Sequence, residues 1–170
     1  MPRLIPWFSK RWTFDAVPTE AWPEVLERLR GSSILLADRV ASLSADLLRR
    51  APPDGAWSIQ KHAGHLSDLE PLWTGRLDDF LAGKATLRDA DLTNQKTHDT
   101  DHDAQGAATL VERFSDVRGA TVARLAALDA ETWGRTSLHP RLQIPMRVLD
   151  LFLFVADHDN WHLARMRELA

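Results

Sequence analysis

Two histidines stand four residues apart in the stretch VADHDNWHLARM near the end of the chain, at His158 and His162. A spacing of four places both imidazoles on one face of a helix, with their Cβ atoms about 5–6 Å apart. At that separation both rings can bind one divalent ion, at about 2.0–2.1 Å for zinc. The alternative is a pair of buried histidines that hydrogen-bond to carbonyls or aspartates. The pair alone therefore indicates a metal site without deciding it.

A third ligand would favour the metal, and the stretch WSIQKHAGHLSDLE offers two candidates, His62 and His65. Helical rotation places His62 nearer the centre of the apolar face and His65 toward one edge. The chain has no cysteine, which excludes a thiolate ligand or a cysteine nucleophile. Periodicity thus leaves the third ligand open, with a slight preference for His62.

Three further histidines each have a structural interpretation and a functional one. His98 and His102 lie four apart in HDTDH and could form a second metal pair or a lid over a substrate. Because the surrounding segment is polar, we favour a solvated loop. His139 precedes Pro140, and we interpret it as a turn residue, with the rim of a pocket as the alternative.

Acidic side chains also lie within a turn or two of the candidate ligands. They are Asp68, Glu70, Asp150, Asp157 and Asp159. One of them could orient an imidazole by accepting a hydrogen bond from its free ring N–H. We expect most of the others to be solvated helix charges.

Four amphipathic helices must position these side chains, because apolar residues recur at spacings of three and four over four stretches. The stretches are 20–43, 59–82, 104–128 and 145–169. Ser58 is the predicted N-cap of the second helix and Gly83 ends it. Pro145 is placed in the first turn of the fourth helix, where its missing N–H does no harm. No segment predicts a strand convincingly.

These helices predict an all-α fold, a four-helix bundle. The second and third helices are joined by about twenty polar residues, 83–103, which is longer than most loops in compact domains. Such a length suits a crossover between parallel helices. We expect residues 1–170 to form one domain, with 1–18 as an N-terminal extension packed on the bundle.

Charge and hydropathy exclude two classes of partner. The net charge is −3 and no basic run is present, so we expect no binding to nucleic acid. No 18 apolar residues follow one another, so we expect neither a membrane span nor a secretion signal. Together with the absence of cysteine, this favours the cytoplasm.

Two stretches resemble the DinB-like (DinB/YfiT) superfamily of metal-binding four-helix bundles: PPDGAWSIQKHAGHLSDLEPLW and HPRLQIPMRVLDLFLFVADHDNWHLARM. The resemblance covers most of the chain and rests on a Trp-Ser-aliphatic helix start, a histidine eight residues after the tryptophan, and a late HxxxH. In that family these three histidines bind one divalent metal. Counting from Trp57, the resemblance selects His65, together with His158 and His162.

The family resemblance also implies a long crossover between the second and third helices, in agreement with the polar segment 83–103. At Trp161 the chain departs from many relatives, which carry a further histidine there. The departure removes no predicted ligand, but the family resemblance then does not predict the shape of the substrate pocket.

A site with three histidine ligands keeps a coordination position for water or substrate. The resemblance therefore implies a metalloenzyme that activates water or a low-molecular-weight thiol, as a metal-dependent hydrolase or a thiol S-transferase. We expect zinc or nickel, a small-molecule substrate and a homodimer. The alternative is a non-catalytic protein, associated with stress or DNA damage, in which the metal is structural. No catalytic residue beyond the ligands is assigned.

Overall fold

The computed structural model describes residues 4–10 and 12–170, except for the side chain of Phe8. The predicted extension therefore falls partly outside the described residues, at 1–3 and 11. Along the chain the elements are η1 (Trp7–Ser9), η2 (Thr19–Ala21), α1 (Trp22–Ala41), α2 (Ala45–Arg49), α3 (Ile59–Leu81), α4 (Gln95–Asp99), α5 (Ala107–Ala126), α6 (Ala130–Trp133), β1 (Thr136–Leu138), β2 (Pro145–Arg147) and α7 (Val148–Leu169).

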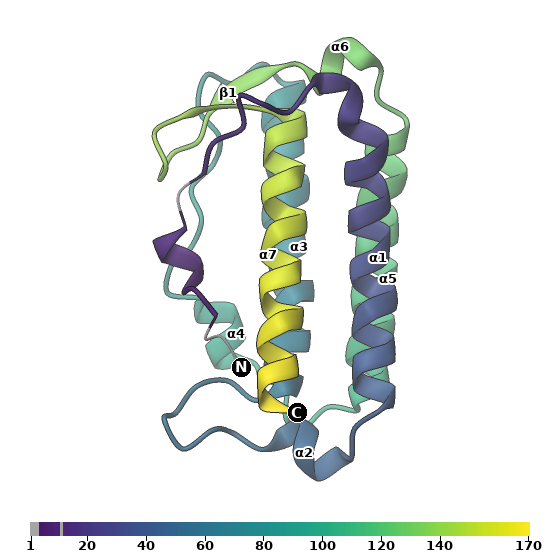
Figure 1. Cartoon of the computed structure of the whole chain (residues 1–170). Helices are drawn as coiled ribbons and strands as arrows, with labels where there is room; N and C mark the ends of the chain where they lie inside the picture. The colour runs from purple at the N-terminus through teal and green to yellow at the C-terminus, as the bar shows by residue number, and fades with distance from the viewer. Residues whose placement is uncertain (1–3, 11) are drawn as a thin grey trace.

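The long helices α1, α3, α5 and α7 form a four-helix bundle, as predicted (Figure 1). Each of α1 and α3 packs against both α5 and α7. Helices α3 and α5 are parallel neighbours: Ser58 contacts Asp103 near their starts, and Arg124 contacts Asp78 near their ends, each at 2.6 Å. A parallel pair requires the intervening segment to return along the bundle, which confirms the crossover.

Both ends of α3 follow the sequence signals. The Ser58 hydroxyl accepts a hydrogen bond from the Lys61 N–H at 2.9 Å and so caps the first turn. After Leu81 the chain leaves the helix through Gly83, whose φ of +66° is easily adopted only without a Cβ. The start that presents the candidate ligands of α3 is therefore fixed by local chemistry.

The prediction that the fourth helix includes Pro145 is wrong. Pro145 lies in β2, paired with Leu138 in a short antiparallel hairpin, and α7 begins at Val148. Asp150 sets this start, because its carboxylate accepts a hydrogen bond from the Arg147 N–H at 2.8 Å. The start of the crossover contacts the hairpin through a parallel β-bridge between Thr86 and Leu138.

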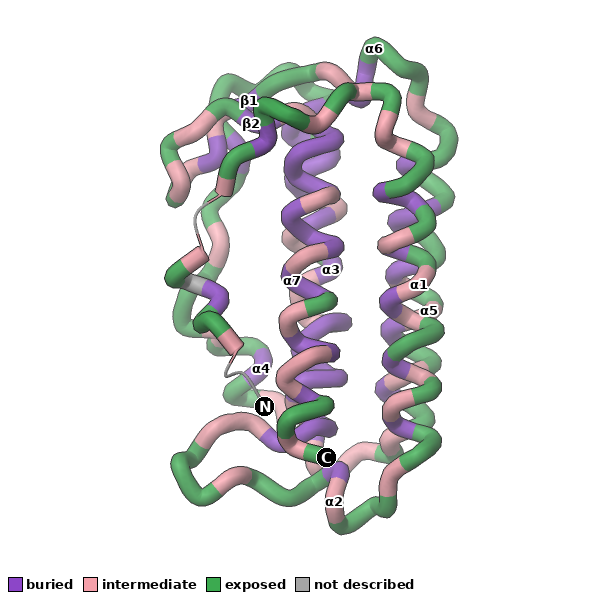
Figure 2. Tube along the Cα trace, viewed as in Figure 1, coloured by how far each residue is buried: buried purple, intermediate pink, exposed green. Residues whose placement is uncertain are grey.

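Buried residues run along the inward faces of the four helices, while the outward faces of α1 and α5 are exposed (Figure 2). Near the N-terminus, Trp7 and Trp12 contact Phe154 of α7, with ring centroids 5.1 and 4.7 Å away. Among residues 4–10 and 12–170, no helix is both long enough and apolar enough to cross a lipid bilayer.

Candidate metal centre

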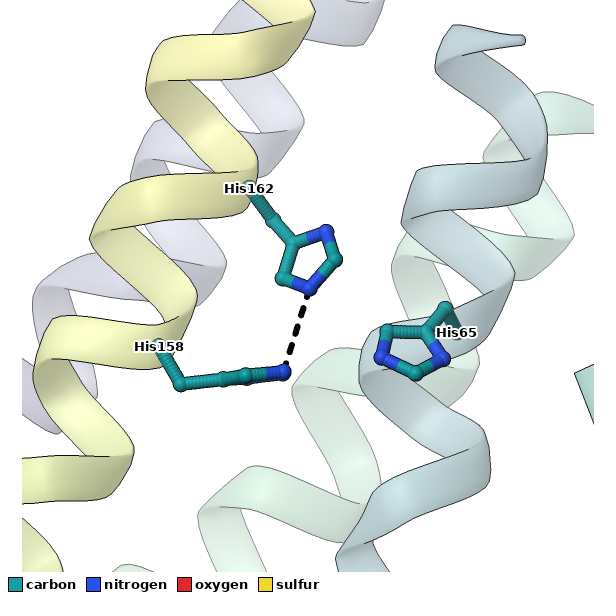
Figure 3. Close-up of side chains that lie close together, drawn as sticks. All are labelled: His65, His158 and His162. Carbon is teal, nitrogen blue, oxygen red and sulfur yellow. Dashed lines mark hydrogen bonds between the residues drawn. The ribbon is translucent and has the colours of Figure 1, made fainter. Parts of the chain in front are cut away.

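His65, His158 and His162 meet in the bundle interior (Figure 3). One nitrogen from each ring lies within 4.8 Å of the other two, and all three residues are buried. The Nε2 atoms of His158 and His162 are 3.1 Å apart. The prediction that this pair faces inward is confirmed, because α7 directs both rings toward His65 on α3.

The tautomer of His65 follows from its contact with the crossover. Its Nδ1 lies 3.0 Å from the Thr97 hydroxyl, which in turn lies 2.9 Å from a carboxylate oxygen of Asp68. The hydroxyl has one proton and donates it to Asp68, so His65 must donate its Nδ1–H to Thr97. The Nε2 of His65 therefore keeps its lone pair for a ligand.

His102 completes this arrangement from the crossover. Its Nε2 lies 2.8 Å from the same oxygen of Asp68, and the residue is buried. Its ring packs so closely on Gly64 that a Cβ there would lie 2.2 Å from Nδ1. The expectation of a solvated segment is therefore wrong for His102, whereas His98 is exposed with its ring 5.7 Å from Trp57.

His62 lies behind His162, outside the three-histidine cluster. The two Nδ1 atoms are 2.8 Å apart, so one ring donates to the other. In the described structure His65 belongs to the cluster, whereas His62 contacts His162 from outside it. A hydrogen bond at Nδ1 fixes the ring and leaves Nε2 directed at the other histidines.

A buried ionic network lies behind His158. Asp159 Oδ1 lies 3.7 Å from His158 Nδ1, and the Asp159 carboxylate contacts Arg118 and the Ser32 hydroxyl, each at 2.8 Å. Arg118 also contacts Glu70, at 2.5 Å. Asp68, Asp159 and Glu70 are therefore side chains with protein partners, which corrects the expectation that most acidic residues here are solvated.

The two remaining acidic residues, Asp150 and Asp157, support the position of α7. Asp150 caps its first turn, and Asp157 forms a half-exposed ion pair with Arg28 of α1. Neither contacts a candidate ligand in the described structure.

Electrostatics keep the cluster available for a cation. Burial, reinforced by the neighbouring histidines, lowers the pKa of His65 to about 2 and that of His162 well below 6.5. Burial, together with repulsion from Arg165 and His158, lowers the pKa of His62 to about 4. These three imidazoles are uncharged at neutral pH, which is the form that binds metal.

The histidines line a cavity of about 410 Å³. Its walls are mostly aromatic and aliphatic, and include Trp57, Trp73, Phe154 and Trp161. Residues 89–92 of the crossover form part of the wall, so the long loop contributes directly to the site. His139 also lines the cavity, as the pocket alternative proposed, and it supports a turn as well, because its Nδ1 lies 3.2 Å from the Leu142 N–H.

A model of the DinB superfamily matches residues 26–166. The chain belongs to the DinB superfamily. The fold of this DinB protein is similar to that of YfiT from Bacillus subtilis, with a TM-score of 0.79 and 19% sequence identity over 94% of this chain and 91% of that one. YfiT is described as a probable metal-dependent hydrolase with an unusual four-helix bundle topology. None of the curated protein sequences compared with the chain matches it significantly.

Trp161 lines the cavity on the side of the N-terminal segment. Its Nε1–H donates to the Ile5 carbonyl at 2.9 Å, and its ring centroid lies 5.0 Å from that of His162. The bulky ring therefore forms a wall of the pocket beside a candidate ligand.

Three polar residues in or near the site were not predicted from the sequence. Arg118 lies four residues after Phe114 on the apolar face of α5, and Arg76 lies four before Phe80 on that of α3. A charged residue at such a position is a usable signal of a buried ionic site. Thr97 has no such signal, because it belongs to a short helix within a polar segment.

Proposed function

We propose that this DinB protein is a metalloenzyme in which His65, His158 and His162 bind one divalent ion at the wall of the cavity. The supporting observation is the convergence of three buried ring nitrogens on a cavity with room for a small molecule. No further His, Asp or Glu joins this cluster in the part of the chain that the structure describes. A position for water or substrate would therefore stay open.

The donor set fits such an ion. Thr97 holds the Nδ1 of His65 and His62 holds that of His162, so each of these rings can offer Nε2 without a rotation. A site of three imidazoles without carboxylate suits zinc or nickel better than magnesium or calcium. We therefore propose zinc or nickel as the resident ion.

When bound, the ion would act as a Lewis acid and lower the pKa of a water or thiol ligand, which supplies a nucleophile near neutral pH. The protein positions the imidazoles through Thr97 and His62, and its aromatic walls exclude bulk water from the reacting molecule. We propose hydrolysis of a small molecule, or transfer of a low-molecular-weight thiol to an electrophile, as the reaction class. The homodimer expected from the sequence stays a prediction.

A purely structural metal is less well supported. Apolar clusters hold the bundle on both sides of the histidines: Val155 belongs to one and Leu163 to the other. Because these clusters bury large apolar surfaces without any ion, we expect the bundle to remain folded when a chelator removes the metal. Loss of the helical circular dichroism signal on chelation would support the structural alternative instead.

Metal analysis of protein purified without a histidine tag tests the ligand assignment. We expect one ion per chain in the wild type, and no stoichiometric ion in His65→Ala, His158→Ala or His162→Ala. The matched control is His62→Ala, which should keep one ion with an affinity about 10–100-fold lower, because only the support of His162 is removed. If His62→Ala loses the ion while His65→Ala retains it, the assignment is wrong.

Activity is then tested on the metal-loaded protein. A panel of esters, amides and lactones tests hydrolysis, and a panel of electrophiles with a small thiol tests transfer. Turnover that is lost in His158→Ala and absent after chelation supports the proposal. A stoichiometric metal with no turnover in either panel would favour the non-catalytic alternative.

A further inference from the structure

Arg76 is a buried cation at the wall of the same cavity. The residue is 1% exposed. Its Nε donates to the Arg88 carbonyl at 3.1 Å, and its Nη1 lies 3.0 Å from His139 Nε2. Its guanidinium forms no ion pair with a carboxylate in the described part of the chain. A buried charge without a counter-charge is costly, so the site is incomplete without an anion.

His139 cannot supply the missing negative charge. Burial, reinforced by Arg76 and Arg141, lowers the pKa of His139 to about 4, so the ring is neutral. A neutral imidazole has only one accepting nitrogen. Yet Arg76 approaches Nε2 while the Leu142 N–H lies 3.2 Å from Nδ1. Both donors cannot be satisfied at once, which leaves Arg76 short of acceptors.

Nearby carboxylates do not neutralise Arg76 either. Asp79 is bound by Arg88 at 2.9 Å and by Lys84 at 2.7 Å. Asp89 lines the cavity but is exposed to solvent, where water weakens its attraction. Burial, together with repulsion from Arg141, lowers the pKa of Arg76 to about 10 despite both aspartates.

Arg76, Trp73 and His158 line the same cavity. Trp73 lies between the other two, with its ring centroid 5.7 Å from Arg76 Cζ and 5.7 Å from the centroid of His158. A molecule that reaches from Arg76 to the histidines must therefore pass along an aromatic wall. Its body is expected to be apolar, with the two polar groups at opposite ends.

We infer that the cavity binds a small organic carboxylate whose anionic end contacts Arg76 and whose apolar body lies along Trp73 toward the three histidines. A carboxylate fits because Nε donates to the Arg88 carbonyl, whereas Nη1 has no acceptor when His139 accepts from the Leu142 N–H, so that Nη1 and Nη2 are left for its oxygens. The chemistry at the histidine end rests on the proposed function, whereas the carboxylate subsite stands on Arg76 alone.

Binding measurements test the subsite without any turnover. The probes are phenylacetate, 3-phenylpropionate and 4-phenylbutyrate, each paired with its neutral amide, and calorimetry and tryptophan fluorescence report binding. Metal-free protein should bind at least one acid about tenfold more tightly than its amide, the effect of one charge-assisted hydrogen bond. Arg76→Met should abolish this preference, Arg76→Lys should keep part of it, and the exposed control Arg124→Met should leave it unchanged.

Folding of the variant gives a second readout. Because Arg76 has no counter-charge without a ligand, the thermal midpoint of unliganded Arg76→Met should equal or exceed that of the wild type. The acids should raise the midpoint of the wild type and not that of the variant. A large fall in the unliganded midpoint would show that Arg76 is structural and would overturn the inference.

Other outcomes separate the two proposals. The subsite is wrong if no acid binds the wild type, if Arg76→Met keeps the preference, or if the preference exists only in zinc-loaded protein, where the carboxylate would bind the ion. If the preference persists in metal-free protein and both activity panels fail, the subsite stands and the proposed enzymatic function falls.

Discussion

Two arginines of this molecule are equally buried but differ in their carboxylate partners. Arg118 of α5 and Arg76 of α3 are each 1% exposed. Arg118 contacts two carboxylates, Glu70 at 2.5 Å and Asp159 at 2.8 Å, whereas Arg76 contacts none in the described structure. Arg76 lines the cavity and Arg118 does not. A buried charge that the protein neutralises itself belongs to the fold, and one left without a partner beside a cavity points to a ligand.

Replacing each arginine by methionine should separate these roles most strongly. Arg118→Met leaves Glu70 and Asp159 buried without their cation, and should lower the free energy of unfolding by about 3–5 kcal/mol. Arg76→Met should cause no such loss. Urea denaturation measures both losses. The control is Arg124→Met, which breaks an exposed ion pair and should lower the free energy of unfolding by less than about 1 kcal/mol. Equal losses for Arg118→Met and Arg76→Met would contradict the comparison.

The two carboxylates around Arg118 should also differ. Burial alone would raise the pKa of Asp159, but attraction by Arg118, together with the contacts with His158 and the Ser32 hydroxyl, outweighs burial and lowers the pKa. Burial raises the pKa of Glu70. Asp159→Asn should therefore lower the free energy of unfolding by about 2 kcal/mol. Glu70→Gln should lower it less, because burial already disfavours the charged form of Glu70 and the amide is neutral. A larger loss for Glu70→Gln at pH 7 would reverse this assignment.

Acid should act on the Arg76 end through His139. A base whose pKa is lowered on folding adds stability above its unfolded pKa of 6.5, and this stability is lost as pH falls toward the folded value of about 4. Between these values the wild type should lose roughly 1–2 kcal/mol more than His139→Gln, allowing for water in the cavity. Denaturation curves at pH 7, 5.5 and 4.5 measure the difference. Parallel losses would show that His139 does not titrate with unfolding.

The smallest change in the free energy of unfolding is expected at Gly75, which lies beside Arg88, the residue whose carbonyl accepts from Arg76. A Cβ there would lie 2.1 Å from Nη1 of Arg88, so Gly75→Ala must displace that side chain from Asp79. Because the end of Arg88 is flexible and exposed, the net cost should be about 1 kcal/mol or less. Gly119→Ala is the control: it meets no atom within 4 Å, and should stabilise α5 by roughly 0.5–1 kcal/mol. Similar stabilisation in both variants would show that Arg88 is not held there.

The helices and their crossover could be predicted because apolar spacing and polar loop length are direct consequences of bundle packing. His158 and His162 followed from the same spacing. Periodicity could not choose between His62 and His65, since both lie within one turn of α3 and are buried, and only the family resemblance selected His65. In the structure, tertiary contacts with His162 for the first and Thr97 for the second distinguish them.

Long-range polar pairs explain the remaining errors. Asp68 and Glu70 look like ordinary helix charges, because their partners stand far away in the sequence: His102 for the first, and Arg118 for the second. Pro145 was misplaced because proline suits both the first turn of a helix and the edge of a hairpin, and the cap by Asp150 decides between them.

The crossover divides into parts that can diverge at different rates. Thr97 and His102 are buried and bonded to α3, so substitutions there disturb the support of His65. Residues 89–92 line the cavity and are mostly exposed, and they belong to no helix or strand. Asp91 is the exception, because its carboxylate accepts hydrogen bonds from the N–H groups of Thr93 and Gln95 at the start of α4. Mutations at 89, 90 and 92 can therefore change which molecules fit the pocket at little cost in stability, and selection for new substrates can act there while the bundle and its histidines stay constant.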